Sequence, residues 1–303
     1  MDWSSEEIVK IIYRLLNVKG IGTVQANRWL WSLPHDVQNA LQLDSYLSRL
    51  LSSEQYESFE QDYVLTPHSP EAGYYATLDD KYPKSLLHLL KQNAPSVLSC
   101  MGNLELLDKE KVGVCGSRKA SEKGLWIAQD CATQLANNGV CIVSGYANGI
   151  DMVAHKTALK NGGDTIIVLP EGIDAFQIKQ DLQEVWDWNR VLVISEFLPR
   201  DAWMASRAMK RNQTIIALSD VMLVIEAGET GGSLDAGMQT LSFGKPLYVP
   251  VFSQIPESAR GNELLFAKGA RSLKQKKETS RSNIDGLLLA IHHPMTEPEL
   301  VFD

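Results

Sequence analysis

Short apolar runs alternate with helical stretches over the central part of the chain. Six runs after residue 111 consist almost entirely of apolar residues: Val112–Cys115, Val140–Val143, Thr165–Leu169, Val191–Ile194, Val221–Ile225 and Leu247–Val251. Such runs are expected of parallel strands that are covered on both faces. A helical stripe follows the first run, at Ala128, Cys131, Ala132, Leu135 and Ala136. The repeat of strand, helix and strand predicts an α/β fold with a doubly wound, mostly parallel sheet.

The first 65 residues have a helical period instead. Apolar residues recur on one helix face, at Ile8, Ile11, Ile12, Leu15 and Leu16. The turn at 19–22 (KGIG) separates this helix from a second one over 24–33. This turn suits a helix-hairpin-helix that presents N–H groups to a phosphate, or a plain turn that needs glycine. We expect a small helical domain, SAM- or helix-hairpin-helix-like, at 1–65, and a Pro- and Gly-containing linker at 66–80.

The composition excludes several classes of protein. The chain has 303 residues and a net charge of −8, and it has no apolar stretch of the roughly 18 residues that a membrane helix needs. Its acidic, polar N-terminus does not resemble a secretory signal, so we expect a cytoplasmic protein. The acidic total argues against coating of nucleic acid over the whole surface, but it allows a local basic site. The cysteines have no metal-ligand spacing and are expected to be reduced and buried: Cys100, Cys115, Cys131 and Cys141.

The segment from 268 to 281 is basic. It contains six cations and one acid, and the cations are Lys268, Arg271, Lys274, Lys276, Lys277 and Arg281. A solvated surface segment and a flexible arm that contacts nucleic acid both fit this pattern. We expect a basic C-terminal tail over 273–303.

Small and polar residues follow the ends of the predicted strands. Ligands of doubly wound sheets bind beyond the carboxyl ends of the strands. The candidate phosphate-binding residues there are Gly116, Ser117 and Arg118, then Ser144, Gly145, Asn148, Gly149 and Asp151, and then Gly231, Gly232 and Ser233. Glycine lets backbone N–H groups approach an anion, and an arginine can bind phosphate with two hydrogen bonds. The pattern favours phosphate binding over turns that merely need glycine.

Several enzyme classes lack their sequence signatures. The 228–233 segment has no Walker lysine, and no G-x-G-x-x-G follows the first strand, so ATP hydrolysis and nicotinamide chemistry are poorly supported. His155 lies one helical turn after Asp151, as an acid–base pair would, but a capping carboxylate with a held histidine explains the pair better. No serine has a nucleophile-elbow context. We predict no catalytic residue, no metal site and no cofactor.

The ordered motifs resemble the DprA/Smf family over about residues 80–272. They include GVCGSR (113–118), SGYANGIDMVAH (144–155), GGDTIIVLPEGID (162–174), RNQTIIALSDVMLVIEA (211–227) and TGGSLDAG (230–237). The resemblance implies an extended Rossmann-like domain at 81–272 that binds single-stranded DNA and forms a homodimer. It also implies help in loading a RecA-type recombinase during DNA uptake, and no catalysis.

The resemblance also implies site residues and two departures from the family. The arginine of GSR is Arg118. The family's cation in the SG-x-A-[KR]-GID motif is replaced by Asn148, and its RNR is Arg211-Asn212-Gln213, preceded by Lys210. Two lost cations should weaken phosphate binding and flatten its salt dependence.

Two other functions remain open on the sequence. A neutralised pocket could take a single nucleotide, as in a nucleotide sensor of an accessory or phage-defence system. An enzyme related to nucleoside-monophosphate phosphoribohydrolases is less well supported, because TGGSLDAG stands in place of their PGG-x-GT-x-x-E loop. We expect no membrane partner.

Overall fold

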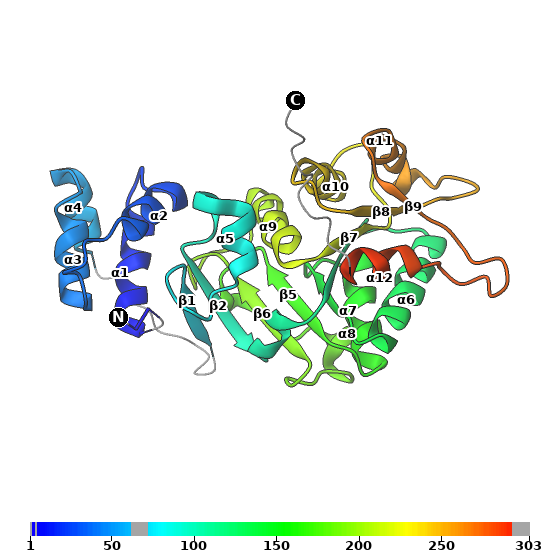
Figure 1. The fold of residues 1–303 in the computed structure, drawn as a ribbon, viewed down its shortest axis with the longest axis horizontal. Helices are drawn as coiled ribbons and strands as arrows, with labels where there is room; N and C mark the ends of the chain where they lie inside the picture. The colour runs from blue at the N-terminus through cyan, green and yellow to red at the C-terminus, as the bar shows by residue number, and fades with distance from the viewer. Residues whose placement is uncertain (1, 4, 62–71, 293–303) are drawn as a thin grey trace, which may run out of the picture. The chain divides into compact units, whose positions relative to one another are not determined.

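The computed structural model describes residues 2–3, 5–61 and 72–292 (Figure 1). Their contacts divide the chain into two compact units. Unit 1 comprises Met1–Leu104, Leu169–Gln177 and Val193–Thr214, and unit 2 comprises Glu105–Val168, Ile178–Leu192 and Ile215–Asp303. The linker expected at 66–80 lies partly in 62–71, outside the described residues. The chain already forms a strand from Gly73.

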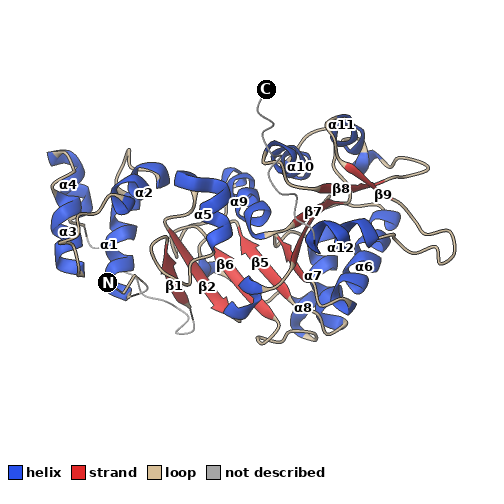
Figure 2. Ribbon diagram, in the orientation of Figure 1, coloured by secondary structure: helices blue, strands red, loops and turns tan. Residues whose placement is uncertain are grey.

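The described residues form a nine-stranded sheet in the order β1-β2-β6-β5-β4-β3-β7-β8-β9 (Figure 2). The strands are β1 (Gly73–Ala76), β2 (Val97–Gly102), β3 (Lys111–Cys115), β4 (Cys141–Ser144), β5 (Thr165–Leu169), β6 (Val191–Ser195), β7 (Val221–Val224), β8 (Leu247–Pro250) and β9 (Arg271–Leu273). Pairing is parallel from β5 through β4, β3, β7 and β8 to β9, and antiparallel between β1 and β2. The doubly wound, mostly parallel sheet is therefore confirmed.

Unit 1 contains the N-terminal helices. They are α1 (Glu6–Asn17), α2 (Thr23–Trp31), α3 (Ala40–Ser48), α4 (Ser53–Phe59) and α5 (Lys84–Leu90), and most of α9 (Ala205–Leu218) belongs to the same unit. Ser5 caps α1 by accepting a hydrogen bond from the Ile8 N–H, and acidic residues occupy the first turn, where the helix dipole favours them. The predicted helical N-terminal region is confirmed.

Buried polar contacts connect the N-terminal helices to the start of the sheet. The hydroxyl of Tyr13 lies 3.0 Å from that of Ser99 in β2. The side-chain amide of Asn27 donates to the carbonyl of Ala94, at 2.6 Å. Since buried polar groups need such partners, these contacts fix the register of α1 and α2 on their apolar core.

The glycine turn between α1 and α2 is tight. Gly20 has a φ of +88°, a conformation that suits glycine, and Gly22 is the N-terminal flanking residue of α2. Ile21 between them is buried. The backbone therefore turns sharply here while one apolar side chain anchors it to the core.

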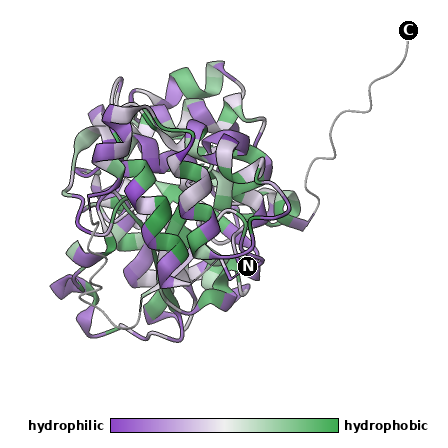
Figure 3. Cartoon of the chain, turned by 90° about the vertical axis from the view of Figure 1, so that its left-hand side faces the viewer, coloured by the Kyte–Doolittle hydropathy of each residue, from purple (hydrophilic) through white to green (hydrophobic). Residues whose placement is uncertain are grey.

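Helices of unit 2 cover the sheet. They are α6 (Glu122–Asn137), α7 (Ile150–Lys160), α8 (Gln180–Gln183), α10 (Gly232–Ser242), α11 (Asn262–Ala267) and α12 (Asp285–His292). Buried residues of α6, α7 and α12 share one apolar cluster with β3, β4 and β7, whereas α10 and α11 pack on β7 and β8. Figure 3 colours each residue by hydropathy, with hydrophobic stretches largely inside the fold and hydrophilic ones largely at its edge. Because β3 to β8 are buried almost throughout, their sequences are nearly continuously apolar.

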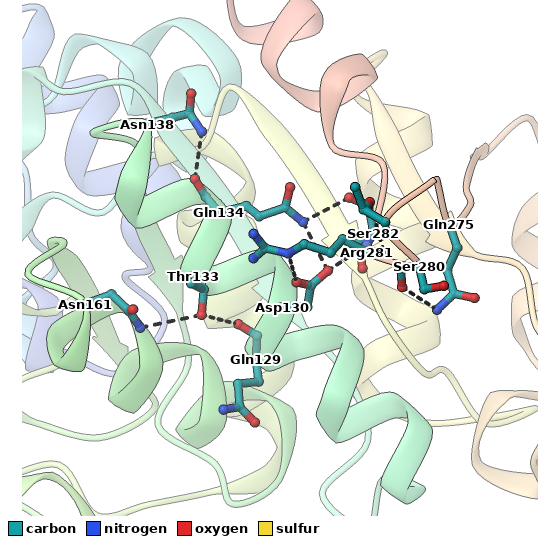
Figure 4. A network of polar contacts seen from close by, with 11 residues as sticks. Gln129, Asp130, Thr133, Gln134, Asn138, Asn161, Gln275, Ser280, Arg281 and Ser282 are labelled. Atoms are coloured by element: carbon teal, nitrogen blue, oxygen red, sulfur yellow. Dashed lines mark hydrogen bonds and ion pairs between the residues drawn. The ribbon is translucent and has the colours of Figure 1, made fainter. Parts of the chain in front are cut away.

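The basic segment expected as a tail is folded as far as His292. It contributes β9, a bridge between Gln275 and Ser282, and α12, whose Leu287 and Ile291 are buried. The carboxylate of Asp130 accepts hydrogen bonds from Arg281 Nε (2.8 Å) and from the Ser282 N–H (2.6 Å) (Figure 4). Only 293–303, the rest of the expected tail, lie outside the described residues.

The four cysteines are free thiols. Burial raises the pKa of Cys100 and of Cys131 to about 12, and it also raises the pKa of Cys141. These thiols therefore remain protonated at neutral pH. No helix among the described residues is long and apolar enough to span a membrane.

Candidate functional site

The loops after β3 and β4 meet at Gly149. This glycine has a φ of +82°, and a Cβ added to it would lie 2.4 Å from the Ser117 carbonyl oxygen and 2.8 Å from that of Arg118. Only glycine fits such an approach. The structure therefore brings two of the predicted loops into contact, with Arg118 and Asn148 exposed on them.

A second close approach holds the same loops. A Cβ on Gly116 would lie 2.6 Å from Cγ1 of Ile150, the first residue of α7. The Ile150 N–H donates to the carbonyl of Ser117, at 3.3 Å. The hydroxyl of Ser117 accepts from the Lys119 N–H, at 3.1 Å, which shapes the turn that carries Arg118.

Two predicted residues have structural roles in this loop pair. The hydroxyl of Ser144 is buried and donates to the carbonyl of Val114, at 2.5 Å. The carboxylate of Asp151 accepts from the Ala147 N–H, at 3.3 Å, and so caps the turn that leads into α7. Ser144 therefore ties β4 to β3 and is buried away from any ligand.

His155 stabilises the loop after β4 through buried hydrogen bonds. It is fully buried, with Nε2 2.6 Å from the carbonyl of Gly145 and Nδ1 2.6 Å from the hydroxyl of Thr165. Because a carbonyl only accepts, Nε2 carries a proton. Nε2 thus holds the Gly145 carbonyl and Nδ1 contacts the Thr165 hydroxyl, so the loop after β4 and β5 hold the histidine.

A lysine missing from the sequence prediction lies beside Asn148. The ammonium group of Lys179 donates to the carbonyl of Tyr146 (2.5 Å) and to Oδ1 of Asn148 (3.4 Å), and it lies 4.4 Å from the centroid of the Tyr146 ring. The backbone N–H of Lys179 also donates to the Tyr146 hydroxyl. A cation therefore lies next to Asn148, the position at which the family resemblance implies a lysine or arginine.

The loop after β7 begins with a buried carboxylate. Glu226 is fully buried and accepts hydrogen bonds from the hydroxyl of Ser121, from the Ser121 N–H (3.0 Å) and from the hydroxyl of Ser258 (2.7 Å). Ser121 is also the N-cap of α6. Glu226 therefore joins the loop after β3 to the loop after β7 as a structural residue.

The glycines predicted after β7 begin α10. Gly231 has a φ of +105° and precedes Gly232, the first residue of that helix. Gly231 and Gly232 are exposed, and Ser233 is half-buried. The side chain of Asn262 holds the start of the loop by accepting from the Ala227 N–H (2.9 Å) and donating to the Ile225 carbonyl (3.1 Å).

Three predicted residues belong to α9 in unit 1. Lys210 is exposed, whereas Arg211 and Asn212 are buried. Nearby, Glu196 accepts a hydrogen bond from the hydroxyl of Thr214, at 3.1 Å. Burial raises the pKa of Glu196, and the charges of Lys210 and Arg211 and the Thr214 hydrogen bond partly oppose that shift. Arg211 therefore lies in a buried polar cluster of its own unit, with an acidic group as neighbour.

The arrangement in unit 2 suits an anion. Arg118, Lys119 and Lys179 place cations on or beside the two loops that meet at Gly149. Within the described residues, no three His, Cys, Asp or Glu side chains are grouped as metal ligands. The chemistry available is charge-assisted hydrogen bonding to phosphate.

A comparison with models of protein families identifies the family to which the chain belongs. Residues 74–283 match the model of DNA recombination-mediator protein A. The chain belongs to the DNA recombination-mediator protein A family. The matched range begins in β1 and ends after the hairpin at 275–282, so family membership covers the sheet and every site loop, but not α1–α4 or α12.

Individual relatives agree with the family match. The chain is 35% identical over 199 residues to DNA processing protein DprA of Streptococcus pneumoniae, which covers 65% of this chain and 69% of that protein. It is 29% identical over 181 residues to DNA processing protein DprA of Bacillus subtilis, or 59% of this chain and 61% of that protein.

Solved structures of family members have the same fold. The structure of DprA from Streptococcus pneumoniae superposes with a TM-score of 0.60 at 27% identity, and the match covers 88% of this chain and 89% of that one. DNA processing protein A from Helicobacter pylori, described for its single-stranded DNA binding mode, gives a TM-score of 0.57 at 29% identity over 69% of this chain and 91% of that one.

Proposed function

We propose that this protein binds single-stranded DNA through the loops that meet at Gly149 and acts as a mediator of DNA recombination. Membership of the DNA recombination-mediator protein A family supports this function. The single observation that supports this location of the site is the contact between the two loops. It gathers exposed Arg118 and the ammonium group of Lys179 at one edge of the sheet. Single-strand binding combines such cations with aromatic rings, and Tyr146 lies under Lys179.

The charge pattern predicts how binding depends on DNA. Each phosphate neutralised by a cation releases counterions, so affinity falls with salt and rises with oligonucleotide length until the site is filled. Bases stacked on an aromatic ring add affinity with little sequence preference. A mononucleotide would contact too few of these cations to bind comparably.

The test is oligonucleotide binding by the whole chain. Fluorescence anisotropy with labelled single strands of increasing length, at two salt concentrations, should show affinity that grows with length and falls steeply with salt. Arg118→Ala should remove most of the binding, and Arg118→Lys, which keeps the charge, should retain part of it. Arg49→Ala is the matched control, because Arg49 is an exposed arginine at the end of α3. Unchanged binding by Arg118→Ala would refute the site.

Membership of the family also supports a more detailed proposal. We infer a homodimer that acts in the cytoplasm, without catalysis, and passes single-stranded DNA to a RecA-type recombinase during DNA uptake or a related process. Light scattering of the purified protein tests the dimer. Stimulation of recombinase filament formation on DNA covered by a single-strand-binding protein tests the mediator role.

A further inference from the structure

A pocket opens in unit 2 at the carboxyl ends of β8 and β9. Its volume is about 590 Å³, within the range of roughly 300–1,000 Å³ that small-molecule sites occupy. Its walls are the first turns of α6, the loop after β8, and the hairpin that follows β9. None of the residues assigned to the DNA site lines it.

The polar lining of this pocket is cationic. It includes two lysines, Lys123 and Lys274, and no aspartate or glutamate, although the chain as a whole carries a net charge of −8. Neither ammonium group forms an ion pair with a described residue, although Nζ of Lys123 lies 4.3 Å from the centroid of the Trp126 ring, which is outside the pocket lining. By contrast, Lys276 on the same hairpin is paired with Asp285. The pocket therefore favours an anion.

The rest of the lining suits a planar ring. Apolar walls are provided by Ile127, Pro250, Phe252, Pro256 and Leu273. The amides of Gln254 and Gln275 lie among them, and an amide offers both a donor and an acceptor; the Gln275 amide already donates to the Ser280 carbonyl, at 3.0 Å. A flat, polar-edged ring would bury its faces against the apolar walls while its charged substituent reaches the lysines.

Two walls of the pocket are held by hydrogen bonds. In the hairpin, the Ser282 N–H donates to the carboxylate of Asp130, and the side-chain amide of Gln134 donates to the Ser282 carbonyl, at 2.9 Å (Figure 4). On the other side, Glu226 holds Ser121. Because these walls are already ordered, a ligand would not have to order them on binding.

We propose that this pocket binds a small organic phosphate with a planar ring, of the nucleoside monophosphate class. The phosphate lies between Lys123 and Lys274, and the ring lies against the apolar walls. The pocket shares Ser121 with the end of the loop after β3, but Arg118, Asn148 and Lys179 do not line it, and the proposal does not depend on the DNA-binding function.

Isothermal titration of the whole chain with AMP, CMP, GMP and UMP tests the proposal. At least one nucleotide should bind saturably, and its nucleoside or inorganic phosphate alone should bind about tenfold more weakly or worse, because each lacks half of the contacts. Lys274→Glu should weaken nucleotide binding by about tenfold or more. Lys277→Glu is the matched control, since Lys277 is an exposed lysine of the same hairpin outside the pocket, and it should change affinity by less than about twofold.

Three outcomes would overturn the proposal. They are the absence of saturable binding by all four nucleotides, equal binding of nucleoside and nucleotide, and loss of nucleotide binding in Arg118→Ala but not in Lys274→Glu. Lys123→Glu provides an independent second variant, and circular dichroism confirms that each variant is folded. Oligonucleotide binding should be the same for Lys274→Glu and Lys277→Glu, so a failure here is distinguishable from a failure of the DNA-binding proposal.

Discussion

Lys179 donates to the side-chain oxygen of Asn148, with Nζ and Oδ1 3.4 Å apart. The two residues follow different strands, Asn148 after β4 and Lys179 after β5, and those strands are parallel neighbours. Their carboxyl ends therefore meet at one edge of the sheet. A lysine from one loop thus supplies positive charge where the other loop has an uncharged amide.

Lys179→Ala should therefore weaken single-stranded DNA binding. One phosphate contact fewer should lower the affinity for all sequences alike and reduce the slope of log K against log salt by about one. Fluorescence anisotropy across a salt series measures both quantities. Lys160→Ala, at the exposed far end of α7, is the control and should keep the wild-type slope. An unchanged slope in Lys179→Ala would exclude Lys179 from the phosphate contacts.

Gly149→Ala should separate the two site loops. Its backbone has φ +82° and ψ −129°, a conformation that is nearly confined to glycine and costs about 1–3 kcal/mol for any other residue. The added Cβ would also lie 2.4 Å from the Ser117 carbonyl oxygen, so backbone must move, at a further cost of about 1–3 kcal/mol. Both the free energy of unfolding and the DNA affinity should fall.

Gly162→Ala is the control for Gly149→Ala, because it has the cost of a positive φ without the close contact of the added Cβ. Gly162 has a φ of +71° at the end of α7, and no atom lies within 4 Å of its added Cβ. It should lose only the positive-φ contribution in urea unfolding and keep its DNA affinity. If the two variants lose the same stability and bind DNA alike, the close loop contact at Gly149 does not hold the site together.

The sheet was predictable because its interior strands are buried on both faces. The six predicted strands match β3 to β8 within one residue at each end, since burial makes them continuously apolar. β9 was missed because only three residues pair at the sheet edge, two of them exposed, so no apolar run marks it. The hairpin that follows β9 is held by Asp130, 151 residues before Arg281, and no local pattern reveals that contact.

The site was predictable only in part. Glycines at close approaches, such as Gly116 and Gly149, are visible in the sequence because no other residue fits there. Lys179 was not, because its relation to Asn148 exists only after β4 and β5 are placed side by side. A search for cations after every strand of the same edge would have found it. Ser144 was overestimated, because hydroxyls that tie strands together have the same sequence pattern as hydroxyls that bind phosphate.

Asp130→Asn should loosen the hairpin that follows β9. The Asp130 side chain is 8% exposed and accepts from Arg281 and from the Ser282 N–H (Figure 4). An amide keeps the shape but loses the charge and one acceptor, so the free energy of unfolding should fall by about 2 kcal/mol. Urea unfolding measures the loss, and hydrogen exchange should rise at 275–282.

The matched control for Asp130 is the surface ion pair of the same hairpin. Asp285, whose side chain is 66% exposed, pairs with Lys276, at 2.8 Å. Asp285→Asn should cost less than about 1 kcal/mol, because exposed pairs are screened by solvent. Equal losses in the two variants would mean that Asp130 contributes no more than an ordinary surface charge.

Lys245 should make stability depend on pH above 8. Burial lowers the pKa of Lys245 to about 8 in the folded protein, against an ordinary value of 10.5, while Asp220 partly opposes the shift. Its ammonium group donates to the carbonyls of Ile216 (2.9 Å) and Ser219 at the end of α9. Between pH 8 and 10.5 the unfolded chain then binds more protons than the folded one, so stability rises with pH in this window.

Lys245→Met removes the titrating group and nearly keeps its length. The difference in free energy of unfolding, wild type minus variant, should therefore increase from pH 8 toward pH 10.5 by about 1–3 kcal/mol and be flat below pH 8. Using a difference cancels the titration of all other groups. Lys160→Met, at an exposed lysine, should give a flat difference over the same range. A flat difference for Lys245→Met as well would mean that the lysine keeps its ordinary pKa, and hence that its carbonyl partners stabilise the charge as fully as water does.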